Sequence, residues 1–365
     1  MSVRTRDYSV SRPKGTGVWT FGGPLTIGGS YPIIVETGNV SDTIHEPDNG
    51  PFFVDSWKLQ GGTINGRQPD STVWTNYIAD GYVGPNQYGH HPAADSPDNL
   101  GAATEGAKRT NPSRPYVDLP AEIFQLHEIP DLIRHTGKQF IDRAADIHIK
   151  ANFGVQPLLT DLMKLITFKN VVNHRVKELE KLHSSGGLKR TVGIYKGSNT
   201  AQGDWTVQTN FGFYTVPSRW ITQEEVRVHC RWFPSATFFP FETNDAPLVS
   251  QARKAVLGGT IDMATAWELI PWTWLIDWAG SVGDYLIATR NVVGATLASV
   301  SVMRHLRTEF HMGQSNVNGT ASVSPAVAIK ETKMRTLSTV FPEAHMPFLN
   351  EGQMGIATSL SILKR

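Results

Sequence analysis

The chain has 365 residues and a formal net charge of +1, so any surface for nucleic acid must come from local clustering of cations. Cys230 is the only cysteine, which excludes an intrachain disulfide framework and a zinc site built from several cysteines. The longest uncharged piece of the most apolar stretch, Leu269 to Ile276, is far shorter than the roughly 20 residues that span a bilayer. The sequence therefore predicts no membrane-spanning segment.

Residues 1–117 are rich in Gly, Pro, Asn and Thr, and short alternating segments such as SYPIIVETG and STVWTNYIAD suit strands between turns. They predict a β-rich, loop-heavy region. Between residues 41 and 100, eight acidic residues stand against Lys58 and Arg67, a net charge of −6. Such a surface repels phosphate.

Residues 118–187 form the first predicted helical region, which begins where Asp118 can cap a helix and Pro120 can open it. Within it, Pro157 suits the first position of a long helix that ends between Ser184 and Gly187. Core positions follow at helical spacing: Leu158, Leu162, Leu165, Val172, Val176 and Leu179.

Residues 188–245 return to strand character. In the segment EEVRVHCRWF, apolar residues 226, 228, 230 and 232 point one way, whereas Arg227, His229 and Arg231 point the other. A second helical region follows at 246–292, and residues 293–365 are expected to add strands and loops that complete the β region.

The second helical region contains AWELIPWTWLIDW, in which Pro271 forces a break between two helices. Its indoles follow helical spacing, so the run is interpreted as core rather than as a ligand box. Asp277, inside the run, must find a cation, a backbone N–H or water. The expected core residues here are Trp267, Trp272, Trp274, Trp278 and Asp277.

The order β, α, β, α, β without repeated βαβ units predicts an α+β protein with segregated layers. In this reading, a helical bundle packs on, or is continuous with, a β-rich region of mostly antiparallel strands. The two parts form one intertwined pair.

Cations gather between residues 164 and 190, where seven stand against Glu178 and Glu180 for a net charge of +5. Such runs are common, and an ordinary solvated helix in which Glu178 and Glu180 neutralise part of the charge is the simpler explanation. Phosphate contacts mainly need positioned cations, so the run and two later strands predict an RNA surface. The candidate contacts are Lys164, Lys169, Arg175, Lys177, Lys181, Lys189, Arg190, Arg227, Arg231, Arg304 and Arg307.

Signals for catalysis are weak. The pairs at 45–46 and 127–128 begin like the zinc-protease motif but lack its second histidine, and no cofactor loop occurs, so no metal or cofactor is predicted. A serine hydrolase using Ser281, Asp277 and a distant histidine such as His305 is the enzymatic alternative, and a non-viral RNA-binding scaffold is another.

Two segments, AWELIPWTWLIDWAGSVGDYL (266–286) and ANFGVQPLLTDLMKL (151–165), resemble the most recognisable segments of the maturation, or A, proteins of single-stranded RNA bacteriophages, the leviviruses. The resemblance implies an elongated, non-enzymatic virion protein made in the host bacterial cytoplasm. Its implied partners are the genomic single-stranded RNA near its 3′ end, coat-protein dimers, one of which it replaces, and a host pilus. No receptor-binding residue can be carried over from the family.

Overall fold

The fold is taken from a computed structural model. It describes residues 2–13, 15–19, 32–44, 50–67, 72–78, 89–115, 168–209, 212–235, 282–291, 293–317 and 321–340.

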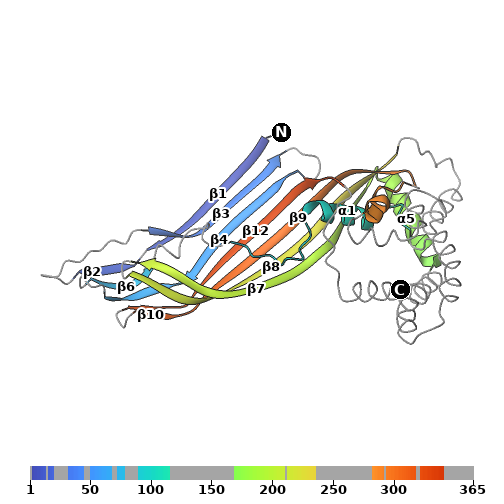
Figure 1. Ribbon diagram of the computed structural model, residues 1–365. Coiled ribbons are helices and arrows are strands. Elements are labelled where there is room, and N and C mark those ends of the chain that lie inside the picture. The colour runs from blue at the N-terminus through green and yellow to red at the C-terminus, as the bar shows by residue number, and fades with distance from the viewer. Residues whose placement is uncertain are drawn as a thin grey trace, which may run out of the picture. The chain divides into compact units, whose positions relative to one another are not determined.

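Strands dominate these residues (Figure 1). They are β1 (Ser2–Pro13), β2 (Thr16–Trp19), β3 (Pro32–Ile44), β4 (Phe52–Gly61), β5 (Thr63–Arg67), β6 (Thr72–Ile78), β7 (Leu188–Thr209), β8 (Gly212–Pro234), β9 (Ala295–Met312), β10 (Ser315–Val317), β11 (Ala321–Val323) and β12 (Ala326–Ser338). The described helices are α1 (Asn99–Thr110), α5 (Phe168–Ser184) and α9 (Val282–Thr289).

The strands form two sheets. The larger has seven strands in the order β1-β3-β4-β12-β9-β8-β7, and the smaller has five in the order β10-β11-β5-β6-β2. The pairings of β1 with β3, β3 with β4 and β4 with β12 are antiparallel. Strand β12 thus lies beside β4, far from it in sequence.

The chain divides into two compact units, each assembled from separate stretches. The first unit comprises Met1–Pro97, Gly193–Arg227 and Ser301–Leu337, and the second comprises Asp98–Val192, Val228–Val300 and Ser338–Arg365. Strands β7, β8 and β9 contribute residues to both units.

The core of the first unit draws side chains from both sheets. Trp57 of β4 and Phe310 of β9 enter it from the larger sheet, and Ile64 of β5 and Tyr77 of β6 enter it from the smaller one. Successive residues of a strand point to opposite faces, so the other face of β8, β9 and β12 carries their alternate, more exposed residues. This second face is called the open face below.

In the second unit, helix α1 packs closely against β8. Asp98 caps the helix through a 2.7 Å bond from the Gly101 N–H to its carboxylate. A Cβ added at Gly106 would lie 2.4 Å from a methyl group of Val228, so only glycine permits this approach. The Asn111 side chain, just beyond the helix, donates to backbone carbonyls at the end of α9.

Two local predictions are confirmed. Val226, Val228, Cys230 and Trp232 are buried, as their alternation in β8 indicates. Helix α5 ends at Ser184, within the expected boundary, and Gly186 follows it with a positive φ of 62°.

The predicted fold class is wrong. The described residues are mostly antiparallel sheet with three helices and show no helical bundle. An apolar stripe shows that a helix buries one side, but it does not show whether that side packs on another helix or on a strand. Helix α1, for example, buries Gly106 against a strand. Long strands, rather than helices, carry most of the described core.

No helix in the described ranges is both long and apolar enough to cross a membrane.

Candidate RNA-contacting surfaces

Helix α5 carries two of the candidate RNA-binding lysines in exposed positions. Lys177 and Lys181 are one helical turn apart and both are exposed, whereas Val172 and Leu179 of the predicted stripe are buried. The helix therefore buries its apolar side in the second unit and keeps these ammonium groups in solvent.

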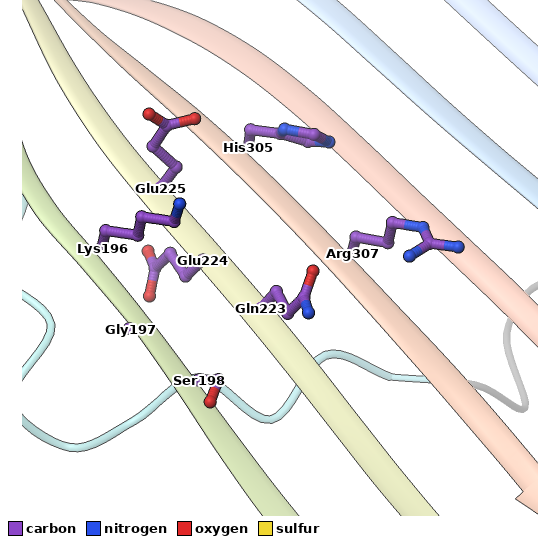
Figure 2. A pocket seen from close by; sticks show the side chains of 8 residues that line it. All are labelled: Lys196, Gly197, Ser198, Gln223, Glu224, Glu225, His305 and Arg307. Atoms are coloured by element: carbon purple, nitrogen blue, oxygen red, sulfur yellow. The ribbon is translucent and has the colours of Figure 1, made fainter.

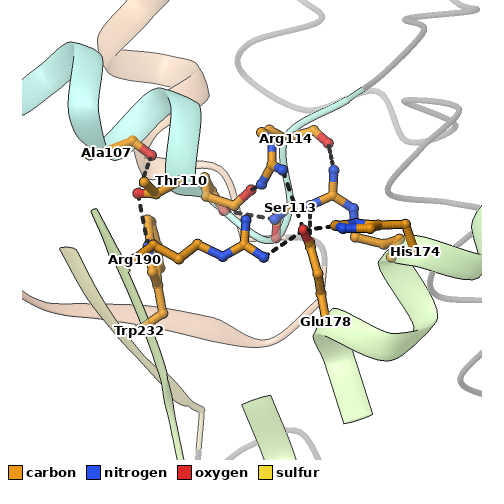
Figure 3. A network of polar contacts seen from close by, with 10 residues as sticks. Ala107, Thr110, Ser113, Arg114, His174, Glu178, Arg190 and Trp232 are labelled. Atoms are coloured by element: carbon orange, nitrogen blue, oxygen red, sulfur yellow. Dashed lines mark hydrogen bonds and ion pairs between the residues drawn. The ribbon is translucent and has the colours of Figure 1, made fainter. Parts of the chain in front are cut away.

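Arg175 and Arg190, two further candidates, meet at one buried carboxylate (Figure 3). Glu178 Oε2 lies 2.7 Å from Arg175 Nη1, and Glu178 Oε1 lies 2.6 Å from Arg190 Nη2 and 3.4 Å from Arg114 Nη2. His174 Nδ1 is 3.3 Å from the same Oε1. We call Arg114, Arg175, Glu178 and Arg190 the Glu178 cluster.

The cluster places three guanidinium groups around one carboxylate in a site where water is scarce. Burial raises the pKa of Glu178, but the attraction of Arg175, Arg114 and Arg190 outweighs burial and lowers it overall. Burial, together with repulsion from Arg114, lowers the pKa of Arg175 to about 10. Arg175 is 4% exposed and donates to the Arg114 carbonyl, so its role is to tie α5 to residue 114 rather than to meet a ligand.

The remaining described candidates of the second unit lie on β7 and β8. Lys189 is exposed, and the Arg231 guanidinium carbon lies 4.4 Å from the centre of the Phe233 ring. Such a cation–π contact orients a guanidinium without neutralising its charge. Both residues belong to the second unit.

The other three candidates belong to the first unit, and each has an acidic partner. Arg227 lies 2.7 Å from Glu225, and Arg307 lies 2.6 Å from Glu309. Arg304 points away from the open face and lies 2.6 Å from the buried carboxylate of Glu224. The predicted RNA surface thus falls on two separate units, and several of its members already form ion pairs.

An open hollow of about 610 Å³ lies on the first unit (Figure 2). Lys196 of β7, Glu225 of β8, and His305 and Arg307 of β9 line it. A second hollow, of about 440 Å³, shares Glu225 and His305 with the first and extends to Arg335. The lining mixes both signs of charge, so a phosphate would find cations here but also repulsion.

Sequence reasoning missed Arg114 and Lys196, which have no periodic pattern around them. Arg114 follows the turn after α1, and Lys196 lies in a strand far from the basic run. A single cation in a turn or strand gives no signal of its own, so only the fold shows that Arg114 faces Glu178 and that Lys196 faces the hollow.

Other residues named in the sequence predictions lie outside the described residues. These are Lys164, the side chain of Lys169, and the expected core positions Pro157, Leu158, Leu162, Trp267, Trp272, Trp274, Trp278 and Asp277.

The residues of the hydrolase alternative are only partly described. Ser281 and Asp277 lie outside the described ranges, while His305 Nε2 is 2.7 Å from Glu331 Oε1 in the first unit. Asp284, on the same predicted helix as Ser281, lies 2.6 Å from Lys108 in an ion pair between α9 and α1. No group of three or more potential metal ligands occurs within the described ranges.

No protein-family model matches the chain, and no curated protein matches it.

Proposed function

We propose that the chain is the maturation protein of a single-stranded RNA bacteriophage. In this role it is a virion component that binds the genomic RNA, takes the place of one coat dimer in the shell and attaches the particle to a host pilus. The observation that carries the proposal is the pair of segments at 151–165 and 266–286, which resemble the maturation proteins in the expected order. The role is non-enzymatic and requires no cofactor.

The RNA contact is assigned first to the exposed side of α5. Lys177 and Lys181 lie on one side of the helix and in solvent, and the helix is held by the Glu178 cluster. Lysine heads in such positions neutralise phosphates and release counterions without reading base sequence. Lys189 and Arg231 extend the positive charge of the second unit.

A charge-reversal series on α5 tests the RNA contact. Lys177→Glu with Lys181→Glu should weaken binding to single-stranded genomic RNA, and the log–log salt slope should become shallower by about 1.4, at about 0.7 for each of two phosphates. Glu180→Lys is the matched control of opposite sign, because Glu180 is exposed on the same helix. It should strengthen binding. Unchanged affinities and slopes in both variants would remove α5 from the interface.

Particle composition tests the virion role separately. The chain should co-purify with coat shells and packaged RNA, and asymmetric imaging should place a single copy at one site of the shell. A chain that binds RNA but never enters coat shells would instead be a non-viral RNA-binding scaffold.

A further inference from the structure

Residues 89–97 of the first unit cross the larger sheet on the side opposite the open face, and they are called the strap below. Figure 2 shows part of this segment running beneath β7, β8 and β9. The strap is held to successive strands mainly by side-chain hydrogen bonds. The sheet residues that hold it are Thr332 of β12, Thr308 and Arg304 of β9, Thr222 of β8, and Tyr195 and Asn199 of β7.

His90 of the strap bonds to two threonines of the sheet. Its Nε2 lies 2.8 Å from the Thr332 hydroxyl and its Nδ1 lies 2.8 Å from the Thr308 hydroxyl. Thr332 in turn donates its hydroxyl hydrogen to Asp55, at 2.6 Å. All three are first-unit contacts, and both threonines are buried.

The carboxylate fixes the direction of this hydrogen-bond chain. An ionised Asp55 can only accept, so Thr332 donates to it and must accept from His90. His90 therefore carries its proton on Nε2, which leaves Nδ1 as the acceptor for the Thr308 hydroxyl. The arrangement requires the neutral ring.

The series of hydrogen bonds continues in the same donor-to-acceptor direction to the strap backbone. The Thr222 and Thr308 hydroxyls are 2.8 Å apart, and the His91 N–H donates to Thr222 at 3.1 Å. Because Thr308 gives its hydrogen to His90, Thr222 must give its own to Thr308. Each of these hydroxyl groups donates once and accepts once.

A second proton on His90 disrupts this order. Charged imidazole donates from both nitrogens, so Thr308 must accept from His90 and turn its hydrogen towards Thr222. The Thr222 hydrogen then loses Thr308, the acceptor that it has in the closed strap. Leaving a buried hydroxyl hydrogen without an acceptor is unfavourable, so the charged ring opposes the closed strap.

The surroundings of His90 act in the same direction. Burial is the main cause that lowers the pKa of His90 to about 4, and Lys330 of β12 and His91 of the strap lower it further. Asp55 of β4 and Glu224 of β8 oppose them. The ordinary pKa of the ring is 6.5, so an open strap takes up a proton at a higher pH than a closed one.

We propose that His90 is a proton-sensitive pin, and that its protonation releases the strap from the sheet of the first unit. Release uncovers an aromatic cluster beneath His91, in which the Trp220 and Phe310 rings lie 5.1 Å apart and edge to face. The side of the larger sheet that the strap crosses thus has two states, in which the aromatic cluster is covered at neutral pH and accessible in acid. The inference concerns a different unit from the α5 contact and does not depend on the proposed function.

Hydrogen exchange across a pH series tests the proposal on the full chain. After correction for intrinsic exchange, opening at the His91 amide, whose N–H donates to Thr222, should increase on the order of a hundredfold between pH 7 and pH 4. Amides of β4 and β12 should stay protected, which separates strap release from unfolding of the unit. Strap opening that is independent of pH would overturn the proposal.

Variants at the two neighbouring histidines sharpen the test. His90→Gln can donate and accept but cannot be protonated, so its strap opening should lose the pH dependence. His91→Gln is the matched control and should keep it, because the His91 contact to Thr222 comes from the backbone. If His90→Gln retains the wild-type dependence, His90 is not the pin.

Direct titration of the ring covers the case in which His90→Gln fails to fold. The His90 ring signal in nuclear magnetic resonance should titrate well below 6.5 in the wild-type chain. Thr308→Val removes the hydroxyl that donates to Nδ1, so it should move that titration to higher pH. A wild-type midpoint at the ordinary value would overturn the proposal independently of the variants.

Discussion

Arg175 Nη1 lies 2.7 Å from Glu178 Oε2, three residues away on α5, and both side chains are about 95% buried. This contact is the centre of the Glu178 cluster, in which one carboxylate opposes three guanidinium groups. Glu178→Gln would leave those cations without a counter-charge in a poorly hydrated site. We expect it to lower the free energy of unfolding by about 3 kcal/mol or more.

Urea unfolding at pH 7 measures this loss. Glu180→Gln is the control, because it makes the same chemical change at an exposed position on the same helix, and it should shift the free energy of unfolding by less than about 0.5 kcal/mol. Equal effects of the two substitutions would contradict a special role for the buried carboxylate.

The same cluster predicts a pH dependence of stability. The pKa of Glu178 is lowered in the folded chain, so its contribution is complete above the ordinary value of 4.5 and is lost as pH falls through the folded value. Because Glu178→Gln has no carboxylate to titrate, the difference in unfolding free energy between it and the wild type should shrink on acidification. Urea titrations at several pH values between 6 and 3 would show this, whereas a constant difference would exclude the linkage.

At Gly106, alanine should destabilise the protein although it has the higher helix propensity. Alanine in a helix interior is normally better than glycine by about 1 kcal/mol, but a Cβ here would lie 2.4 Å from Val228. Overpacking costs about 1–3 kcal/mol, so Gly106→Ala should destabilise the second unit. Thermal unfolding of Gly106→Ala, Val228→Ala and the double variant gives the coupling, and the smaller residue at 228 should relieve part of the loss.

Local patterns in the sequence correctly predicted features that depend on a single strand or on the end of one helix. The alternation in β8 indicated that Val226, Val228, Cys230 and Trp232 share a face, and Gly186 marked the end of α5. Helix α1 was missed because its two glycines argue against a helix, although Gly106 is what lets the helix approach β8.

The pairing of strands that are far apart in the sequence could not be predicted from local patterns. Periodicity identifies a strand but not its neighbour, so the placement of β12 beside β4 could not be predicted. The Glu178 cluster assembles residues from the turn after α1, from α5 and from β7, and the basic run alone suggested solvent-facing cations. His90 follows a stretch rich in glycine and proline that has no periodicity, and only the fold places Thr308 and Thr332 on either side of its ring.

Cys230 offers a probe of opening in the second unit. Its thiol is fully buried in β8, and burial raises its pKa to about 11, so the reactive thiolate is scarce in the native chain. At pH 8 a disulfide reagent should therefore label the native protein only through opening events, while denaturant should expose one reactive thiol per chain. Gly106→Ala loosens the packing of α1 on β8 and should speed native labelling, whereas Glu180→Gln should not. Rapid labelling of the native wild type, or equal rates in all three proteins, would show that opening of the α1–β8 contact does not control access to this thiol.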